Sequence, residues 1–225
     1  MVSEQELGAI FAEIGKEYGY DTVTAEFMAF KDFKVRWQRS YRWADFKVSD
    51  YLMDAPDGVI RGLCKSLYSR ITGAGDDTYS EEMCAWVTSP RFVEDKQALY
   101  LKRCRNIART TSGSTKDLSA SYARLVEMGL ANEDPTIYLS WSEAFARKAG
   151  SCSVLMRVIT MSKALDSAEI PDFVLDYCLY HEICHLLIGF DPTGDRHSEK
   201  FLALEAKYPR QAEAEEWLDK LCLHL

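Results

Sequence analysis

The stretch 172–188 constrains the fold more than any other part of the chain, because it is apolar on nearly every side. Drawn as a helix, it has no continuous polar face, and a helix that is hydrophobic all round is buried. It nevertheless contains His181, Glu182 and His185. Burying polar groups without partners costs several kcal/mol, so these three side chains need partners inside the core.

Residues 181–185 read His-Glu-Ile-Cys-His, and their spacing suits one helix face. Positions i and i+4 lie about 40° apart around a helix axis, so His181 and His185 project together, one turn apart. Two imidazoles placed this way can bind one zinc ion. Glu182 then lies beside the remaining coordination space, where it can move a proton from water to a leaving amine. The alternative is that both histidines are satisfied core side chains and that Glu182 pairs with an arginine.

A catalytic zinc ion needs a third protein ligand and keeps one position open for water. His197 is the first candidate, because the intervening stretch 189–194 is rich in Gly, Asp and Pro and can reverse the chain. We expect a helix over about 195–208, with His197 in its first turn and facing back toward the motif. Three histidines then match the ligand count of a catalytic site.

Two glutamates are rival third ligands, because glutamate also binds zinc. Glu205 is the stronger rival, since it lies two helical turns beyond His197, and Glu199 is the weaker one. The alternative for both is surface charge on an exposed helix. Cys184 lies inside the motif but projects about 100° away from its neighbours, so it is a poor fourth ligand. A position left open favours catalysis, because structural zinc sites are closed by four protein ligands.

Residues 180–187 (Tyr-His-Glu-Ile-Cys-His-Leu-Leu), followed by 197–201 (His-Ser-Glu-Lys-Phe), resemble the SprT-like and YgjP-like zincin metallopeptidases. The core of these families reads HE-[LI]-[AC]-HL, then a short loop and HSxxF. The segments 150–153 (Gly-Ser-Cys-Ser) and 170–177 also match YgjP-like members. The resemblance covers about residues 137–209.

This resemblance implies a zinc-dependent metallopeptidase that hydrolyses peptide bonds in a protein or peptide substrate. His181, His185 and His197 would be the zinc ligands, and Glu182 would be the general base and acid. The implied fold is a minimal zincin-like α+β fold with HExxH on its active-site helix. A second hypothesis is a nucleic-acid- or protein-binding module, DNA-associated as in SprT-like proteins, whose zinc site is catalytically idle.

Helices are predicted where apolar residues recur at helical spacing between start and stop residues. They cover about 4–18, 57–72, 79–109 with a break near 89–90, 118–129, 171–188, 195–208 and 212–221. Strands are predicted where apolar and polar residues alternate. They lie within 22–51, at 137–141 and at 154–161.

The strand segments suggest two different roles. Within 22–51 we expect two or three antiparallel strands, forming an N-terminal β-meander. Residues 150–153 are predicted as a turn that enters the strand 154–161. That strand is a candidate edge strand, which could bind a peptide by strand addition. The alternative is an ordinary core strand.

The length of 225 residues, without an internal repeat or linker, predicts one domain over 1–225. Within it we expect an N-terminal strand and helix region (1–136), a zincin catalytic core (137–209) and a C-terminal helix (210–225). The seven cysteines are odd in number and include no CxxC, which argues against a disulfide framework and a zinc ribbon. Without a signal-peptide pattern or a run of about 18 apolar residues, we expect a cytoplasmic protein with no membrane partner.

The net charge of -8 argues against a general polyanion binder, but two stretches are locally basic. Residues 31–47 interleave six Lys or Arg with Trp37, Tyr41 and Trp43, and residues 100–116 contain five Lys or Arg and no acid. Basic residues beside aromatics can bind single-stranded nucleic acid, which is therefore a candidate partner. The alternative is the solvated face of an antiparallel sheet, with the aromatics on its core face.

Other polar side chains could support the site. Asp172 and Asp176 precede His181 on the same predicted helix, and a carboxylate often orients a ligand histidine. Asp176 could equally cap the helix or face solvent. Hydrolysis also needs an electrophile for the oxyanion, and the sequence does not choose between several candidates. These candidates are Tyr177, Tyr180, Tyr208 and Arg157.

Overall fold

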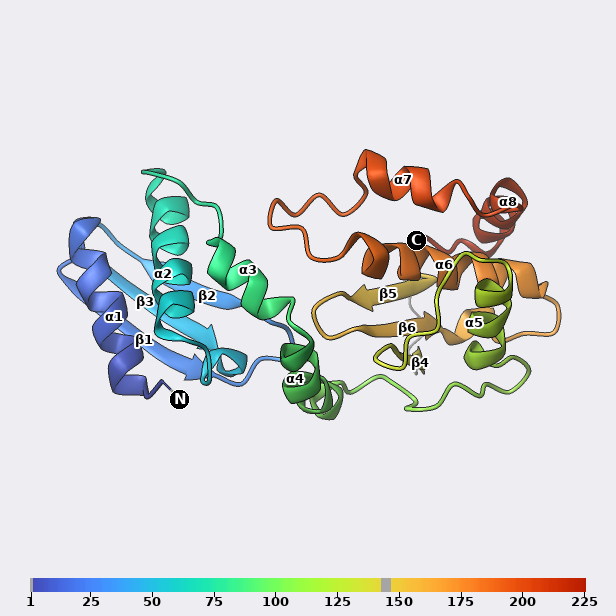
Figure 1. Ribbon diagram of the computed structural model, residues 1–225, viewed down its shortest axis with the longest axis horizontal. Helices are drawn as coiled ribbons and strands as arrows, with labels where there is room; N and C mark the ends of the chain where they lie inside the picture. Colours follow the sequence, from blue (N-terminus) through green and yellow to red (C-terminus); the bar gives the residue numbers. More distant parts are fainter. Residues whose placement is uncertain (1, 143–146) are drawn as a thin grey trace. The chain divides into compact units, whose positions relative to one another are not determined.

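The computed structural model describes residues 2–142 and 147–225 (Figure 1). The chain divides into two compact units, Met1–Arg103 and Cys104–Leu225, and each is described by itself. The division falls well before residue 137, where the predicted catalytic core begins, so the second unit contains that core and the segment that precedes it. The single domain over 1–225 stays a prediction.

The first unit combines a three-stranded sheet with helices. Its elements are α1 (Glu4–Glu17), β1 (Thr22–Met28), β2 (Val35–Arg39), β3 (Trp43–Ser49), the 3-10 helix η1 (Asp50–Leu52), α2 (Asp57–Thr72), α3 (Glu81–Val87) and α4 (Pro90–Arg103). α1 begins with a capping box formed by Ser3 and Glu6, as their spacing predicts. α2 ends at Gly73, whose left-handed φ of 71° suits a glycine.

The predicted β-meander is wrong, although strands form where the alternation predicted them. A meander would place β2 in the centre, antiparallel to both neighbours. The order is instead β1-β3-β2, with β1 parallel to β3 and β2 antiparallel to it. β3 takes the centre because it carries the buried row Ala44, Phe46 and Val48, whereas β2 is mostly exposed. Alternation indicates which residues face the core, but it does not determine the order in which strands pair.

An aromatic core joins α1 and α2 to the sheet. The ring of Phe46 on β3 lies with its centroid 4.9 Å from that of Phe11 on α1 and 5.2 Å from that of Tyr68 on α2. The buried Tyr68 hydroxyl donates to the Phe11 carbonyl at 3.0 Å, which satisfies its polar group inside the core. This core is built without any residue of the predicted metal site.

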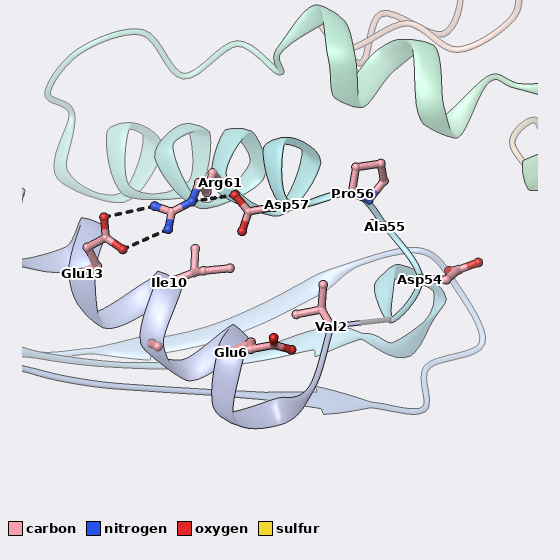
Figure 2. Close-up of a pocket in the computed structure, with 10 residues that line it drawn as sticks. Val2, Glu6, Ile10, Glu13, Asp54, Ala55, Pro56, Asp57 and Arg61 are labelled. Atoms are coloured by element: carbon pink, nitrogen blue, oxygen red, sulfur yellow. Dashed lines mark hydrogen bonds and ion pairs between the residues drawn. The ribbon is translucent and has the colours of Figure 1, made fainter.

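Figure 2 shows a pocket between α1 and the start of α2 in which Arg61 binds two of the lining carboxylates. Arg61 donates two hydrogen bonds to the Glu13 carboxylate, at 3.1 and 3.0 Å, and one to Asp57 at 2.8 Å. Asp54 accepts a hydrogen bond of 2.5 Å from Lys96. These ion pairs join α1 to α2, and the segment before α2 to α4, so they stabilise the fold of this unit.

The second unit is arranged about one helix. Its elements are α5 (Leu118–Glu127), β4 (Tyr138–Ser142), β5 (Gly150–Ser153), β6 (Val158–Ser162), the 3-10 helix η2 (Lys163–Leu165), α6 (Asp172–Ile188), α7 (Glu199–Glu205) and α8 (Gln211–Leu221). The sheet order is β4-β6-β5, with β4 parallel and β5 antiparallel to β6. α6 contacts β5 and β6 as well as α5, α7 and α8 (Figure 1).

α6 is the buried helix that the apolar stretch predicts. Most of its residues are buried, including His181 and Glu182. Pro171 precedes its first residue, and Gly189, with a φ of 82°, follows its last. Even so, no helix in the described parts of the chain is long and apolar enough to cross a membrane.

The predicted strand 154–161 is wrong in both extent and position. Residues 154–157 form a turn, closed by the Arg157 residue with a left-handed φ of 52°. β6 follows this turn as the central strand and is buried on both faces, as central strands commonly are. The edge strand is β5, in the segment predicted as a turn.

Candidate metal centre

Three imidazoles converge where α6 meets the segment before α7. The nitrogen atoms of His181, His185 and His197 that could bind a metal all lie within 4.8 Å of one another. His181 is buried, His185 half-buried and His197 exposed, so the cluster extends from the core to the surface. Imidazole nitrogen suits zinc and several other transition metals. The structure thus brings together all three predicted ligands in a group that could hold a metal ion.

His185 has the protonation state that a metal ligand requires. Burial, together with the neighbouring His181 and His197, lowers the pKa of His185 to about 4. The ring is therefore neutral at pH 7 and has a lone pair to donate, because imidazole binds metals in its neutral form. No proton would have to leave His185 before a metal ion could bind at that pH.

His197 lies just before α7, not in the first helical turn as predicted. The helix begins at Glu199, with Ser198 as its N-cap. The chain between Gly189 and His197 is irregular and turns twice, at 192–193 and 196–197. A loop therefore supplies the third imidazole, and the Gly- and Pro-rich composition that predicted a chain reversal is where that loop forms.

Phe201 forms an apolar wall behind the three histidines. Its ring centroid lies 5.0 Å from that of His181, 4.6 Å from that of His185 and 4.7 Å from that of His197. Phe201 is fully buried, so it can hold its position in the core. Sequence reasoning used Phe201 only as a letter of the HSxxF pattern and missed that it contacts every imidazole.

Glu205 is neither surface charge nor a member of the histidine group. It is only 7% exposed, and its Oε1 lies 2.6 Å from Nδ1 of His181. The buried Tyr177 hydroxyl donates to the same oxygen at 3.0 Å. Burial acts to raise the pKa of Glu205, but the hydrogen bonds from His181 and Tyr177 outweigh it, so this pKa lies below its ordinary value. Glu199, the weaker rival, is exposed.

The group of potential ligands, taken over the described residues, consists of the three histidines and no cysteine. The Cys184 thiol is buried, and burial raises its pKa to about 12. Cysteine binds metals as a thiolate, so this thiol is a poor ligand in the present structure. The expectation that Cys184 points away from the metal site agrees with this arrangement.

Glu182 lies beside the cluster in a site that water barely reaches. It is 3% exposed, and burial raises its pKa to about 7, although the nearby His181 and Lys148 act in the opposite direction. Within the described residues, no arginine forms an ion pair with it. The alternative prediction of a Glu182–arginine pair therefore has no support here.

Gly150 makes room for this carboxylate. A Cβ atom at Gly150 would lie 2.7 Å from Oε1 of Glu182 and 2.9 Å from its Cγ, closer than real Cβ contacts come. The first residue of β5 must therefore be small for Glu182 to lie against the strand. The edge of the second sheet and the candidate acid–base group are thus in direct contact.

The upstream aspartates do not contact the histidines. Asp176 accepts two hydrogen bonds from Arg124, at 2.7 and 2.6 Å, and one from Ser121 at 2.5 Å. It therefore joins α6 to α5 and neither caps the helix nor faces solvent. Asp172 forms an ion pair with Lys116, and that hydrogen bond lowers the pKa of Asp172.

The four candidate electrophiles are all engaged with other groups. The tyrosine hydroxyls bind the Glu205 carboxylate, the Leu204 carbonyl and the Phe173 carbonyl, and Arg157 binds Asp134. These contacts hold α6, α7 and the β5–β6 turn in place. Each tyrosine hydroxyl has a single proton, so it would have to break its present bond to stabilise an oxyanion, and the structure favours none of the four candidates.

Two of the six cations in the basic stretch 31–47 pair with acids from neighbouring segments. Lys47 binds Glu26 at 3.0 Å, and Arg42 forms an ion pair with Asp21. The register places Trp37 opposite Phe46, whereas Trp43 lies on the other face of the sheet. The two tryptophans therefore lie on different faces of the sheet, and binding of nucleic acid stays a prediction.

The helix and the loop together define the class of this site. Two histidines and a glutamate on a buried helix, with a third histidine from the following loop, match the HExxH pattern, and the three histidines could hold a metal ion. Residues 115–216, just under half of the chain, match the SprT-like family. The resemblance seen in 137–209 is thereby confirmed, and the match begins before it, ahead of α5. Searches of curated proteins and of solved structures found no match to this chain.

Proposed function

We propose that the second unit is a zinc-dependent metallopeptidase with a minimal zincin-like fold. His181, His185 and His197 are the zinc ligands in this proposal, and Glu182 is the general base and acid. One observation carries it. The three-histidine group and a buried glutamate with a pKa of about 7 lie side by side in a SprT-like segment.

A zinc ion held by the three imidazoles would supply Lewis-acid chemistry, polarising a carbonyl group and making water more acidic. The chain's own contribution is proton transfer. The Glu182 carboxylate accepts the proton of the attacking water and later returns it to the leaving amine. In the metal-free protein burial raises the pKa of this carboxyl to about 7. A group whose pKa is near the working pH can accept and donate a proton at similar cost. Burial beside Gly150 keeps bulk water from competing for that proton.

The edge of β5 is the proposed substrate-binding strand, in place of the segment 154–161. The Ser162 N–H donates to the Ala149 carbonyl, so these two residues face each other as a hydrogen-bonded pair. Hydrogen-bonded and non-hydrogen-bonded pairs alternate along an antiparallel ladder. The main-chain groups of Gly150 and Cys152 therefore point away from β6. An extended peptide can pair with these groups by strand addition. Such a peptide would pass directly beside Glu182, because that carboxylate lies against Gly150.

The test compares the native chain with Glu182→Gln. We expect both to bind one zinc ion per chain. The native chain should cleave an unfolded protein substrate, whereas the variant should be slower by about 100-fold or more, because it lacks the acid–base group. Glu199→Gln, which changes an exposed carboxylate of the same unit, is the matched control and should cleave like the native chain.

If both proteins bind zinc and neither cleaves the substrate, the zinc site is idle and the peptidase proposal fails. The binding-module hypothesis then takes its place. Repeating the assay with single-stranded DNA tests the nucleic-acid partner separately, because a gain in cleavage or a salt-dependent complex would reveal it.

A further inference from the structure

We infer that Glu205 is a positioning residue, which holds His181 as the Nδ1–H tautomer and leaves Nε2 as the ligand atom of that ring. The inference deepens the proposed function, because it concerns the same metal centre. It assigns to Glu205 a role that excludes the role of a rival zinc ligand.

The contact between Glu205 and His181 determines which ring nitrogen of His181 carries the proton. Oε1 of Glu205 lies 2.6 Å from Nδ1 of His181, within hydrogen-bond distance, and both side chains are buried. A carboxylate is an acceptor only, so in this contact the ring nitrogen is the donor. The proton of a neutral His181 is thereby placed on Nδ1, and the lone pair remains on Nε2.

The second step is that Glu205 itself is held in place. Its Oε1 also accepts a hydrogen bond of 3.0 Å from the Tyr177 hydroxyl, on the same face of α6 as His181. That hydroxyl lies 2.9 Å from Oε1 of Glu215 on α8. The side-chain amide of Gln211 donates a hydrogen bond of 2.8 Å to the same Glu215 oxygen. The chain of contacts extends from the metal centre across α7 to α8. Glu205 is therefore oriented from outside the cluster as well as from within it.

The third step is electrostatic. A negative carboxylate bonded to Nδ1–H raises the basicity of Nε2 and fixes the ring plane, and both effects strengthen metal binding. Residues in such a position commonly contribute about 10- to 100-fold to metal affinity. Glu199 has the same charge on the same helix but is exposed, which makes it the natural comparison.

The experiment measures zinc affinity by chelator competition in Glu205→Gln and Glu199→Gln. We expect Glu205→Gln to bind zinc about 10- to 100-fold more weakly, and Glu199→Gln to match the native chain within about twofold. Equal affinity in the two variants would overturn the inference. Cobalt-substituted protein supplies a second measurement, since its absorption reports coordination number. A changed coordination number in Glu205→Gln would make Glu205 a ligand and would also overturn it.

Nitrogen NMR of the metal-free native chain separates this inference from the proposed function. We expect the proton of neutral His181 on Nδ1, and loss of that preference in Glu205→Gln. A native His181 protonated on Nε2 would overturn the inference even if zinc binds. Conversely, if the native chain binds no zinc, the proposed function fails, but the tautomer of His181 still tests whether Glu205 positions that ring.

A second pair of variants guards against misfolding of Glu205→Gln. Tyr177→Phe removes one donor to the Glu205 carboxylate, and Tyr208→Phe removes a buried hydroxyl that binds the Phe173 carbonyl instead. We expect a several-fold loss of zinc affinity in the first and none in the second, at comparable folded content by circular dichroism. Equal affinities would contradict the role assigned to Glu205.

Discussion

The two three-stranded sheets of this protein have the same topology but different surroundings. In each, the first strand is parallel to the third, and the second is antiparallel to it, so the third strand is central (Figure 1). The hairpin strand β2 of the first sheet is mostly exposed and carries charged side chains. Its counterpart β5 begins with Gly150, against a buried carboxylate of α6. Sheet topology alone therefore does not account for the candidate site. The second unit differs in having a buried helix, α6, that carries polar side chains.

The largest expected difference between the units concerns their bidentate Arg–Asp pairs. Arg124 binds Asp176, whose side chain is 5% exposed, and Arg103 binds Asp50, whose side chain is 19% exposed. Arg124→Met should lower the free energy of unfolding by about 3–5 kcal/mol, because Asp176 stays buried without its cation. Arg103→Met should cost less, since water can reach Asp50. Urea unfolding of both variants checks this, and equal losses would contradict it.

The next prediction concerns the pH dependence of the buried site. In metal-free protein, burial raises the pKa of Glu182 to about 7, above its value in the unfolded chain. Between about pH 4.5 and 7 the folded state therefore binds more protons at Glu182 than the unfolded state does, so this contribution to stability falls as the pH rises. The expected loss is about 3 kcal/mol.

The lowered pKa of His185 acts in the opposite direction, because its neutral folded form is favoured as the pH rises from about 4 to 6.5. The measurement must therefore compare the native chain with Glu182→Gln, in which the His185 contribution remains. We expect the native free energy of unfolding to decline relative to that of the variant across this pH range. A difference that does not change with pH would show that burial does not perturb Glu182.

The smallest effect distinguishes two glycines. Gly150→Ala should cost about 1–3 kcal/mol, because the new Cβ would lie 2.7 Å from Glu182 and force it to move. A Cβ atom at Gly8, inside α1 of the first unit, would lie 3.8 Å from the Ala25 carbonyl oxygen, which is an ordinary van der Waals contact. Gly8→Ala should stabilise the protein by about 0.5–1 kcal/mol, since alanine is the better helix former. Urea midpoints that move in the same direction would contradict this contrast.

Local spacing was enough to predict the helix-borne part of the site. His181 and His185 are one turn apart on any helix that includes them, and the apolar stretch around them predicted burial. Confirming His197 as a neighbour required the folded chain, because its approach depends on the path of a loop. The role of Glu205 was missed for a similar reason. Its partners His181 and Tyr177 lie far away in sequence and meet it only when α7 packs on α6.

The errors in the sheets arise because strand order and backbone conformation depend on contacts between segments that are distant in sequence. Alternation in 22–51 located strands but carried no information on their order, so β3 was not recognised as central. The turn at 154–157 was missed because Arg157 adopts a left-handed φ that usually indicates glycine or asparagine. Conversely, Gly150 suggested a turn, whereas it is there to make room for the Glu182 side chain.

The position of His197 on a loop, rather than on a helix, affects how a bound metal ion would constrain the chain. Two imidazoles belong to a rigid helix and the third to a loop, so an ion bound to all three would act as a cross-link across the loop between His185 and His197. Closing so short a loop costs little chain entropy, which favours assembly of the site. Removing the ion would free the loop at one end. Protease cleavage within 190–196 should therefore report whether the centre is loaded.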